Sequence, residues 1–203
     1  MSQLKLTADG GGGTVAIKGP ASTTGNNAFE LTVPGTASGT ILTSNSSVGK
    51  ILQVKQTVKD DVTSTTSTSF AAISGMSVNI TPTATSSKIL LMVDLKIGGD
   101  GAVVQVRFKR GTNNIYTGNN AGANFNDITM ATYGGNDTGS GYYDAALVGG
   151  QFLDSPNTTS QVTYAVHWAR QNSATAYLNR TGYDSGNTSS RMSSSITVME
   201  VAA

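Results

Sequence analysis

Apolar and polar residues alternate along much of the chain after residue 50. The segment 88–97, KILLMVDLKI, places an apolar residue at every second position and sets lysine or aspartate between several of them. Segments 102–110 (AVVQVRFKR) and 161–170 (QVTYAVHWAR) keep the same period, and 51–59 (ILQVKQTVK) follows it in part. Successive side chains of a strand point to opposite faces, so this alternation predicts half-buried β-strands.

The apolar positions that the alternation assigns to one face of each segment are, in chain order, Leu52, Val54 and Val58; Ile89, Leu91, Val93, Leu95 and Ile97; Ala102, Val104, Val106 and Phe108; and Val162, Tyr164, Val166 and Trp168. The last segment, 194–201 (SSITVMEV), is apolar on both faces, which predicts a central or interface strand. No apolar stripe of helical period extends beyond two turns. Residues 50–203 are therefore predicted to form an all-β domain, an antiparallel and jelly-roll-like β-sandwich, with a barrel as the alternative.

Residues 1–49 carry a different pattern, in which short alternating stretches flank glycine-rich connections. LKLT at 4–7 is matched by FELT at 29–32, and a connection and a second strand follow each, which indicates a weak repeat of about 25 residues. Each strand has one apolar face and too little chain to cover it, and an isolated hairpin is marginal in water. Either the rest of the chain or identical copies must cover these faces. The residues predicted to pack there, between the chains of a trimer, are Leu4, Leu6, Val15, Ile17, Phe29, Leu31 and Val33.

Composition and charge narrow the functional classes. Charged residues make up 12% of the chain, the net charge is +1, and there is no cysteine. Nucleic-acid binding is not expected, because no concentrated basic run occurs. No apolar run approaches the ~18 residues of a membrane span, and residues 1–10 lack the apolar core of a secretory signal, so neither membrane insertion nor secretion is expected.

Candidate catalytic and metal-binding residues are few. His167 is the only histidine, and its place in an alternating segment predicts a structural role rather than a catalytic triad or a zinc site. Paired carboxylates could cleave a glycan, and the candidates are Asp127, Asp137, Asp144, Asp154 and Asp184. Most lie in turn contexts, where aspartate commonly stabilises the backbone. The glycine-rich run 133–141 has one carboxylate and no lysine, so neither calcium nor phosphate is expected there. We therefore expect no enzyme, no cofactor and no metal.

Two irregular segments, 111–144 and 179–191, interrupt the strand pattern. Both are rich in glycine and asparagine and both contain tyrosine. Long loops on a rigid scaffold often carry binding residues, and sugars are commonly held by aromatic rings beside short polar groups. Tyrosines also fill strand ends and subunit seams, so a packing role stays open for the same residues. The predicted receptor-binding residues are Tyr116, Tyr133, Tyr142, Tyr143, Tyr183 and Asp184.

Particular stretches resemble a known class of virus protein. Residues 4–22 (LKLTADGGGGTVAIKGPAS) and 29–44 (FELTVPGTASGTILTS) resemble the N-terminal modules of tail-fibre proteins of tailed bacteriophages, especially phages of marine bacteria. Residues 49–98 and the ending SSSITVMEVAA resemble a C-terminal β domain of such proteins, and residues 110–160 are not covered.

This resemblance implies a homotrimeric virion protein made in the cytoplasm of a bacterial host. Its N-terminal module would attach to other tail or capsid proteins, and its head would bind a host surface glycan or protein. A capsid head fibre or decoration protein is the first alternative, because the chain is short for a tail fibre. A polysaccharide-degrading spike enzyme is the second, although such enzymes resemble long parallel β-helices and this chain is short for one.

Overall fold

The computed structural model describes residues 3–7, 14–18, 49–99, 101–119, 127–134, 143–184 and 190–203. The chain divides into two compact units, Met1–Thr43 and Ser44–Ala203. Every regular element in the described residues is a β-strand, and every strand pairing is antiparallel. The all-β prediction is confirmed.

The first unit contains a two-stranded hairpin of β1 (Gln3–Thr7) and β2 (Thr14–Lys18). Its register pairs Leu4 with Ile17 and Leu6 with Val15, so apolar positions lie opposite apolar positions. The second copy of the repeat, with Phe29, Leu31 and Val33, lies outside the described residues. Packing of this unit between copies of the chain stays a prediction.

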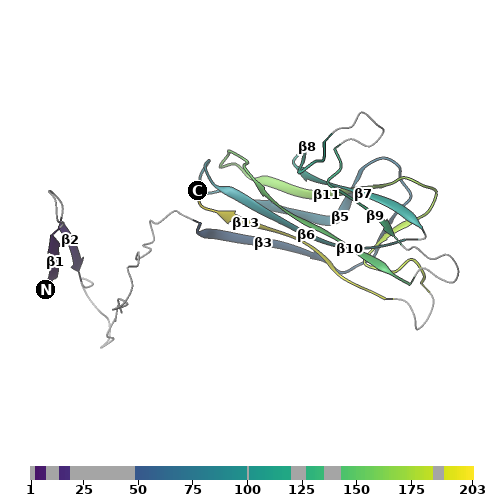
Figure 1. Ribbon diagram of the computed structural model, residues 1–203, viewed down its shortest axis with the longest axis horizontal. Helices are drawn as coiled ribbons and strands as arrows, with labels where there is room; N and C mark the ends of the chain where they lie inside the picture. Colours follow the sequence, from purple (N-terminus) through teal and green to yellow (C-terminus); the bar gives the residue numbers. More distant parts are fainter. Residues whose placement is uncertain are drawn as a thin grey trace. The chain divides into compact units, whose positions relative to one another are not determined.

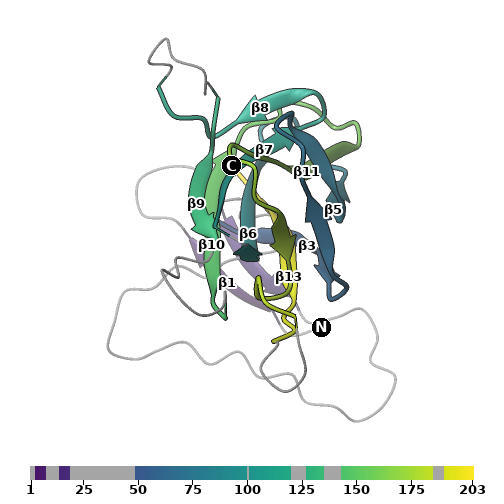
Figure 2. The ribbon, with the colours of Figure 1, turned by 90° about the vertical axis from the view of Figure 1, so that its right-hand side faces the viewer.

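The second unit is built from two sheets. The first sheet contains β3 (Ile51–Lys59), β4 (Thr63–Thr65), β6 (Lys88–Gly99), β10 (Ala145–Asp154), β12 (Ala176–Leu178) and β13 (Ser194–Val201). The second sheet contains β5 (Ala71–Ile80), β7 (Ala102–Arg110), β8 (Asn113–Ile115), β9 (Met130–Gly134) and β11 (Val162–Arg170). Figure 2 looks roughly along the strands and shows the sheets as two facing layers.

The strand order is that of a jelly roll. Setting the short strands β4, β8 and β12 aside, the first strand β3 pairs with the last, β13, and the second, β5, pairs with the second-last, β11. Inside these pairs, β6 pairs with β10 and β7 pairs with β9. Such nested antiparallel pairing is produced when one long hairpin is rolled into two sheets. The predicted jelly-roll-like sandwich is confirmed, and the barrel alternative is not adopted.

The core lies between the two sheets and consists of their inward-facing apolar residues. The predicted inner faces of 88–97, 102–108 and 162–168 are confirmed, because every apolar residue assigned to them is buried. The strand β13 lies between β3 and β6, as its apolar character on both faces predicted. Burial of this much apolar surface is the main source of stability for such a domain.

The edge strand β3 departs from the expected pattern. Leu52, Val54 and Val58 share a face, but that face is exposed. The opposite face carries polar residues that are held at the rim of the core, and Lys59 among them is buried with its Nζ 2.7 Å from Asp61. The period of two was predicted correctly, and the expectation that the apolar face is the buried one was wrong.

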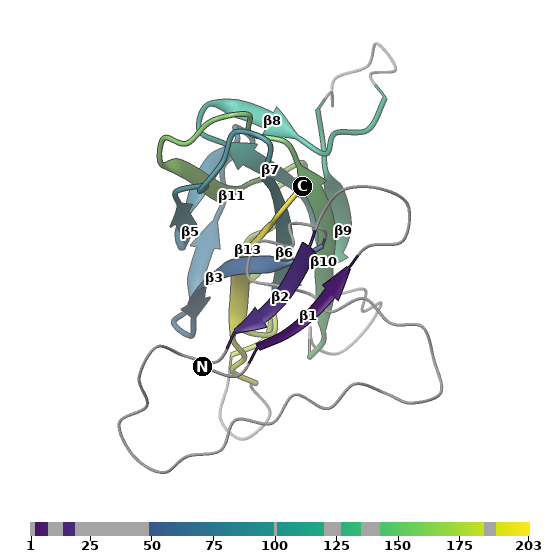
Figure 3. The same cartoon turned by 90° about the vertical axis from the view of Figure 1, so that its left-hand side faces the viewer.

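The sandwich has two distinct ends. The main-chain oxygen of Lys50, where the chain enters β3, accepts a hydrogen bond from the nitrogen of Ala202, 2.8 Å away. The incoming chain and the C terminus therefore share one end, here called the tether end (Figure 3). The opposite end, here called the loop end, is where β6 finishes and both β10 and β12 begin. The labels of β6 and β10 locate it in Figure 1.

Candidate functional site

Three of the six predicted binding residues meet at the loop end. Gly98 of β6 pairs with Ala145 of β10 on one side and with Tyr177 of β12 on the other. Beyond β12 the chain first follows β6 to Lys96, whose oxygen accepts a hydrogen bond from Asn179 N, and then returns over Gly98 at Arg180. This return brings the segment after β12 close to the residues before β10. The rings of Tyr143 and Tyr183 consequently lie edge to face, with centroids 5.0 Å apart, and both side chains are exposed.

Asn179 anchors the segment that carries Tyr183. It follows β12, is fully buried and has φ of 66°, a left-handed conformation that asparagine tolerates better than most residues. Its Nδ2 donates to the main-chain oxygens of Lys59, at 2.7 Å, and Asp61, at 3.0 Å, and its Oδ1 accepts from Ser194 Oγ at 2.6 Å. The side chain thus joins β12 to the end of β3 and the start of β13.

The main chain beyond Asn179 runs directly over β6. A Cβ atom on Gly98 would lie 2.2 Å from the main-chain oxygen of Arg180, closer than non-bonded atoms approach. Only glycine fits at this crossing, because the obstructing atom belongs to the backbone and cannot rotate away. The start of the Tyr183 segment is therefore held both by the buried Asn179 and by close contact with β6.

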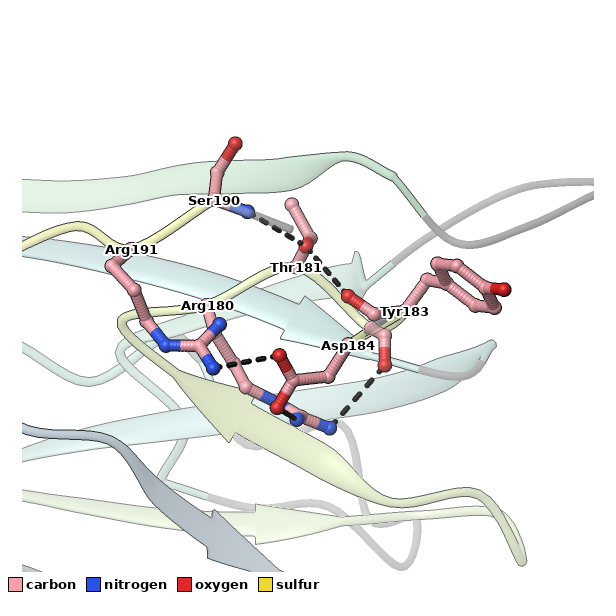
Figure 4. A network of polar contacts seen from close by, with 7 residues as sticks. Arg180, Thr181, Tyr183, Asp184, Ser190 and Arg191 are labelled. Atoms are coloured by element: carbon pink, nitrogen blue, oxygen red, sulfur yellow. Dashed lines mark hydrogen bonds and ion pairs between the residues drawn. The ribbon is translucent and has the colours of Figure 1, made fainter. Parts of the chain in front are cut away.

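Two arginines fix Asp184 (Figure 4). Arg180 Nη1 donates to Asp184 Oδ2, and Arg191 Nη2 donates to Asp184 Oδ1 at 2.6 Å. The Arg180 guanidinium also lies over the ring of Tyr177, with Cζ 3.6 Å from the ring centroid. Thr181 Oγ1 donates to the main-chain oxygen of Tyr183 at 2.9 Å. These bonds tie 180–184 to residue 191 across the base of the segment.

The electrostatics of Asp184 favour a fixed charge. The hydrogen bond from Arg191 is the largest cause that lowers its pKa, and the positive charges of both arginines act in the same direction. A carboxylate in this setting stays ionised and is poorly suited to donate a proton as a general acid. The cluster therefore presents two aromatic rings beside an ion-pair network of two arginines and one aspartate, which suits binding better than proton transfer.

The remaining predicted binding residues are not brought to this cluster. Tyr116 stacks on Phe152 with ring centroids 5.2 Å apart, and Phe152 pairs with Leu91 in the middle of the sheet. At about 3.3 Å per residue, the level of Phe152 lies roughly 20 Å along β10 from Ala145. Tyr133 belongs to β9, but its side chain lies outside the described residues, as does all of Tyr142. The idea of one site formed by all six residues is therefore not supported for Tyr116.

Asp154 plays a different part from the one its sequence context predicted. It is the last residue of β10 rather than a turn residue, and it is buried. Arg110 Nη1 lies 2.8 Å and 2.9 Å from its two carboxylate oxygens, and Tyr164 donates its hydroxyl to Oδ2 at 2.6 Å. The carboxylate thus links β10 of the first sheet to β7 and β11 of the second. Burial is the largest cause that raises the pKa of Tyr164, followed by the hydrogen bond to Asp154.

The other catalytic candidates lie apart from one another. Asp127 is exposed with φ of 63°, and its main-chain oxygen accepts from Arg107 Nε at 3.0 Å. Asp144 is exposed beside Tyr143, and Asp137 lies outside the described residues. His167 lies half-buried on the outer face of β11, and burial followed by the charges of Lys109 and Arg107 lowers its pKa.

Sequence reasoning missed the arginines and the anchoring asparagine. Asn179, Arg180 and Arg191 bound the irregular segment 179–191, and the sequence signal was two arginines flanking a single aspartate. Within the described residues, no group of three or more histidine, cysteine, aspartate or glutamate side chains could hold a metal ion. In the same part of the chain, no helix is long and apolar enough to cross a membrane.

Comparisons with known proteins give only distant likenesses, all of them to solved structures. No protein-family profile matches the chain, and neither does any curated protein sequence. Among solved structures, the structure of infectious bursal disease virus Gx strain is similar at 10% identity and a TM-score of 0.33. The similarity covers 74% of this chain and 37% of that one, so this chain spans well under half of the other's length. The fold assignment rests on the strand order of the chain itself.

Proposed function

We propose that this protein is a structural component of a bacteriophage virion, a short trimeric tail fibre whose head binds the host surface. The observation that carries the proposal is the opposition of the two ends of the sandwich. The connection to the N-terminal unit enters at the tether end, and the exposed Tyr143, Tyr183 and Asp184 gather at the loop end. The cluster therefore lies at the end of the sandwich opposite to the point where the chain enters it.

The separation of the two ends supports this role. Lys88 of β6 pairs with Val201 at the tether end, and Gly98 pairs with Tyr177 at the loop end. An extended strand rises about 3.3 Å per residue, so the two levels are roughly 30 Å apart. A receptor bound at the loop end would not interfere with the attachment of the tether end.

The ligand class follows from the chemistry of the cluster. Aromatic rings offer flat apolar faces to the C–H surfaces of sugars, and nearby polar groups bond to their hydroxyls. Tyr143 and Tyr183 supply the rings, and Asp184 supplies a carboxylate held rigid by Arg180 and Arg191. We propose a host surface glycan as the first receptor class and a host surface protein as the second.

The same residues support a binding role rather than catalysis. Retaining and inverting glycosidases place two carboxyl groups about 5 to 10 Å apart and keep one of them protonated. Asp184 is held ionised by its arginines, and Asp154 is engaged in a buried link between the sheets. We accordingly propose that the protein does not hydrolyse its receptor. Release of oligosaccharides from host polysaccharide by the purified protein would overturn this part of the proposal.

Binding is tested with two variants of the purified full-length protein. Tyr143→Ala combined with Tyr183→Ala removes both rings of the cluster, and Tyr116→Ala removes an exposed tyrosine elsewhere on the head. We expect adsorption to host cells to fall at least tenfold for the double variant, equivalent to ~1.4 kcal/mol. The Tyr116→Ala control should keep its adsorption. Equal adsorption of the double variant and the native protein would remove this cluster from the receptor site.

The location of the protein on the virion distinguishes a tail fibre from a capsid head fibre or decoration protein. We retain that second candidate because a chain of 203 residues is short for a tail fibre. Antibodies against the protein, applied to intact phage and viewed by electron microscopy, should label the tail. Label distributed over the capsid would favour the head fibre or decoration protein instead.

A further inference from the structure

The outward face of the first sheet is unusually apolar for a surface. Among the described residues, the exposed large hydrophobic side chains include Val54 and Val58 on β3, Met92 on β6, and Leu147 and Leu153 on β10. None lies on β5, β7 or β11, whose outward positions include Arg107, Lys109 and His167. A contiguous apolar area on one side of a molecule commonly marks an interaction surface.

Strand register arranges these residues in rows. Val54 pairs with Met199, Met199 with Leu90, and Leu90 with Leu153, so an apolar row crosses all four long strands near the tether end. The most exposed members occupy the two edge strands. Val54 is 52% exposed and Val58 is 58% exposed on β3, and Leu153 is 53% exposed and Leu147 is 71% exposed on β10.

The middle of this face is hollow. An open hollow of about 440 Å³ lies between β3, β13, β6 and β10, and Gln56, Thr197, Gln151 and Gly149 are among the residues that line it. A Cβ atom on Gly149 would lie 2.6 Å from the main-chain oxygen of Val93, so the residue that leaves this space open is confined to glycine. Polar side chains therefore share the lining of the hollow with Met92, and the most exposed apolar residues stand on the two edge strands.

Charge does not prevent copies of this face from meeting one another. Its charged residues in the described part of the four long strands are Lys88, Asp94 and Lys96. Asp94 and Lys96 form an ion pair at 2.5 Å, and Lys88 donates to Ser155 Oγ at 2.7 Å. Each charge is thus engaged within its own chain, and no large like-charge repulsion is expected when identical faces approach.

We infer that this face turns toward the common axis of a homotrimer, with β3 of one copy beside β10 of the next. The inference rests on the proposed function, which supplies the trimer. A cyclic arrangement joins two different edges of the same sheet and closes on itself. Because Val54 and Leu153 belong to one row across the sheet, the symmetry places them at about the same height on neighbouring copies. In the described residues β3 pairs only with β13, and β10 only with β6, so neither edge is hydrogen-bonded to a further strand. β9 of the second sheet lies beside β10 (Figures 2 and 3) without pairing with it.

The dimensions of the sheet fit this arrangement. Four strands at about 4.8 Å spacing give a face roughly 19 Å wide. Three such faces set as a triangle lie about 5 to 6 Å from their axis, close to half of the ~10 Å that separates packed sheets. Outward side chains therefore fill the interior without moving the backbone.

The area explains why a tether is needed. Eight residues at about 3.3 Å each give the face a length of roughly 26 Å and hence a projected area on the order of 500 Å². This is below the ~800 Å² that each partner buries in a standard stable interface. Heads held only by this face should associate weakly, and linkage through residues 1–49 raises their effective concentration.

Cysteine pairs test the inference in the full-length protein, which has no cysteine of its own. Within one chain, Val54 and Leu153 are three strand spacings apart, about 14 Å, which is too far for a disulfide. Val54→Cys combined with Leu153→Cys should therefore form bonds only between copies, and mild oxidation should yield a covalent trimer. Each single variant should remain uncross-linked.

The control pair lies on the opposite sheet. Ser77 and Lys109 both pair with Ala165, one on each side, and lie on the outward side of the second sheet. The combined variant Ser77→Cys and Lys109→Cys should give no covalent trimer. Cross-linking of Val54→Cys alone would indicate a two-fold contact and overturn the inferred arrangement. A trimer by sedimentation without cross-linking of the Val54 and Leu153 pair would also overturn it, while leaving the proposed trimeric fibre intact. A monomer by sedimentation would overturn both.

A second variant probes the same surface without oxidation. Leu153→Lys places a charge on the edge of β10, and Thr163→Lys places one on the exposed face of β11. We expect the first to raise the dissociation constant of the trimer at least tenfold and the second to leave it within a factor of about two. Equal dissociation constants for the two variants would count against the apolar face.

Discussion

At the scale of the residue, Asn179 contributes more to the stability of the loop end than any of the tyrosines. Its side chain makes three hydrogen bonds in a fully buried position, and its φ is 66°. Asn179→Ala would leave two main-chain oxygens and a hydroxyl without these partners, and would place a Cβ residue without local hydrogen bonds in the left-handed region. We expect a loss of about 2 to 4 kcal/mol in the free energy of unfolding, measured by urea denaturation.

Asn157 offers a matched control for the backbone part of this loss. It also has a positive φ, 52°, but its side chain is exposed. Asn157→Ala should cost only about 1 to 2 kcal/mol, the approximate penalty of a left-handed conformation. Equal losses for the two variants would mean that the buried hydrogen bonds of Asn179 contribute little.

The sequence could indicate some of these residues but not their roles. Tyr143, Tyr183 and Asp184 were predicted from the composition of two irregular segments, and the structure brings those three together. Their proximity depends on the pairing of Gly98 with Ala145 of β10 and on the passage of Arg180 over Gly98, long-range contacts that local patterns do not encode. Asn179 could not be distinguished from the other asparagines of the chain, because its importance comes from burial against strands far away in sequence.

At the scale of the element, the end of β13 is joined to its neighbours by one buried carboxylate. Glu200 accepts hydrogen bonds from Gln53 Nε2 of β3, at 2.6 Å, and from the main-chain nitrogen of Thr83, at 2.6 Å, ahead of β6. Burial raises its pKa, but the hydrogen bonds from Gln53, Thr83 and Ser87 outweigh that effect, and the pKa lies below its ordinary value of 4.5. The ionised form is therefore the one that stabilises the fold.

This direction fixes the pH dependence of Glu200→Gln. Since the folded pKa is lower than the unfolded one, the stability that the carboxylate contributes is present above about pH 4.5 and is lost as the pH falls through the folded pKa. Glu200→Gln should cost about 2 kcal/mol at pH 7, and the difference from the native protein should shrink between pH 5 and pH 3. Urea denaturation of both proteins across this range measures the difference. A constant difference would show that Glu200 is not ionised when folded.

The elements also show where pattern reasoning holds and where it fails. In β6, β7 and β11 the apolar face is the buried one, because facing strands cover both sheets along these central positions. In the edge strand β3 the apolar face points outward, while Gln53 and Lys59 on the other face find partners in Glu200 and Asp61. Alternation gives the period of a strand, but its buried side depends on what covers it. For β3, we infer that this cover is another copy of the chain.

At the scale of the whole molecule, the two units should contribute differently to assembly. The sandwich has its own core between two sheets, and the buried residues of that core all belong to Ser44–Ala203. The outward face of its first sheet is too small for a stable interface by itself, at roughly 500 Å² against the ~800 Å² that a partner commonly buries. Removal of residues 1–45 should therefore leave folding intact and weaken association.

The truncated chain provides the measurement. Its circular dichroism should retain the β-sheet signal and its urea transition should remain cooperative, because the core is complete without the first unit. Sedimentation equilibrium should show the full-length chain as a trimer and the truncated chain as a monomer at micromolar concentration, because linkage no longer raises the effective concentration of the heads. A truncated chain that stays trimeric would show that the heads alone hold the assembly together, and one that unfolds would show that the sandwich needs its N-terminal unit.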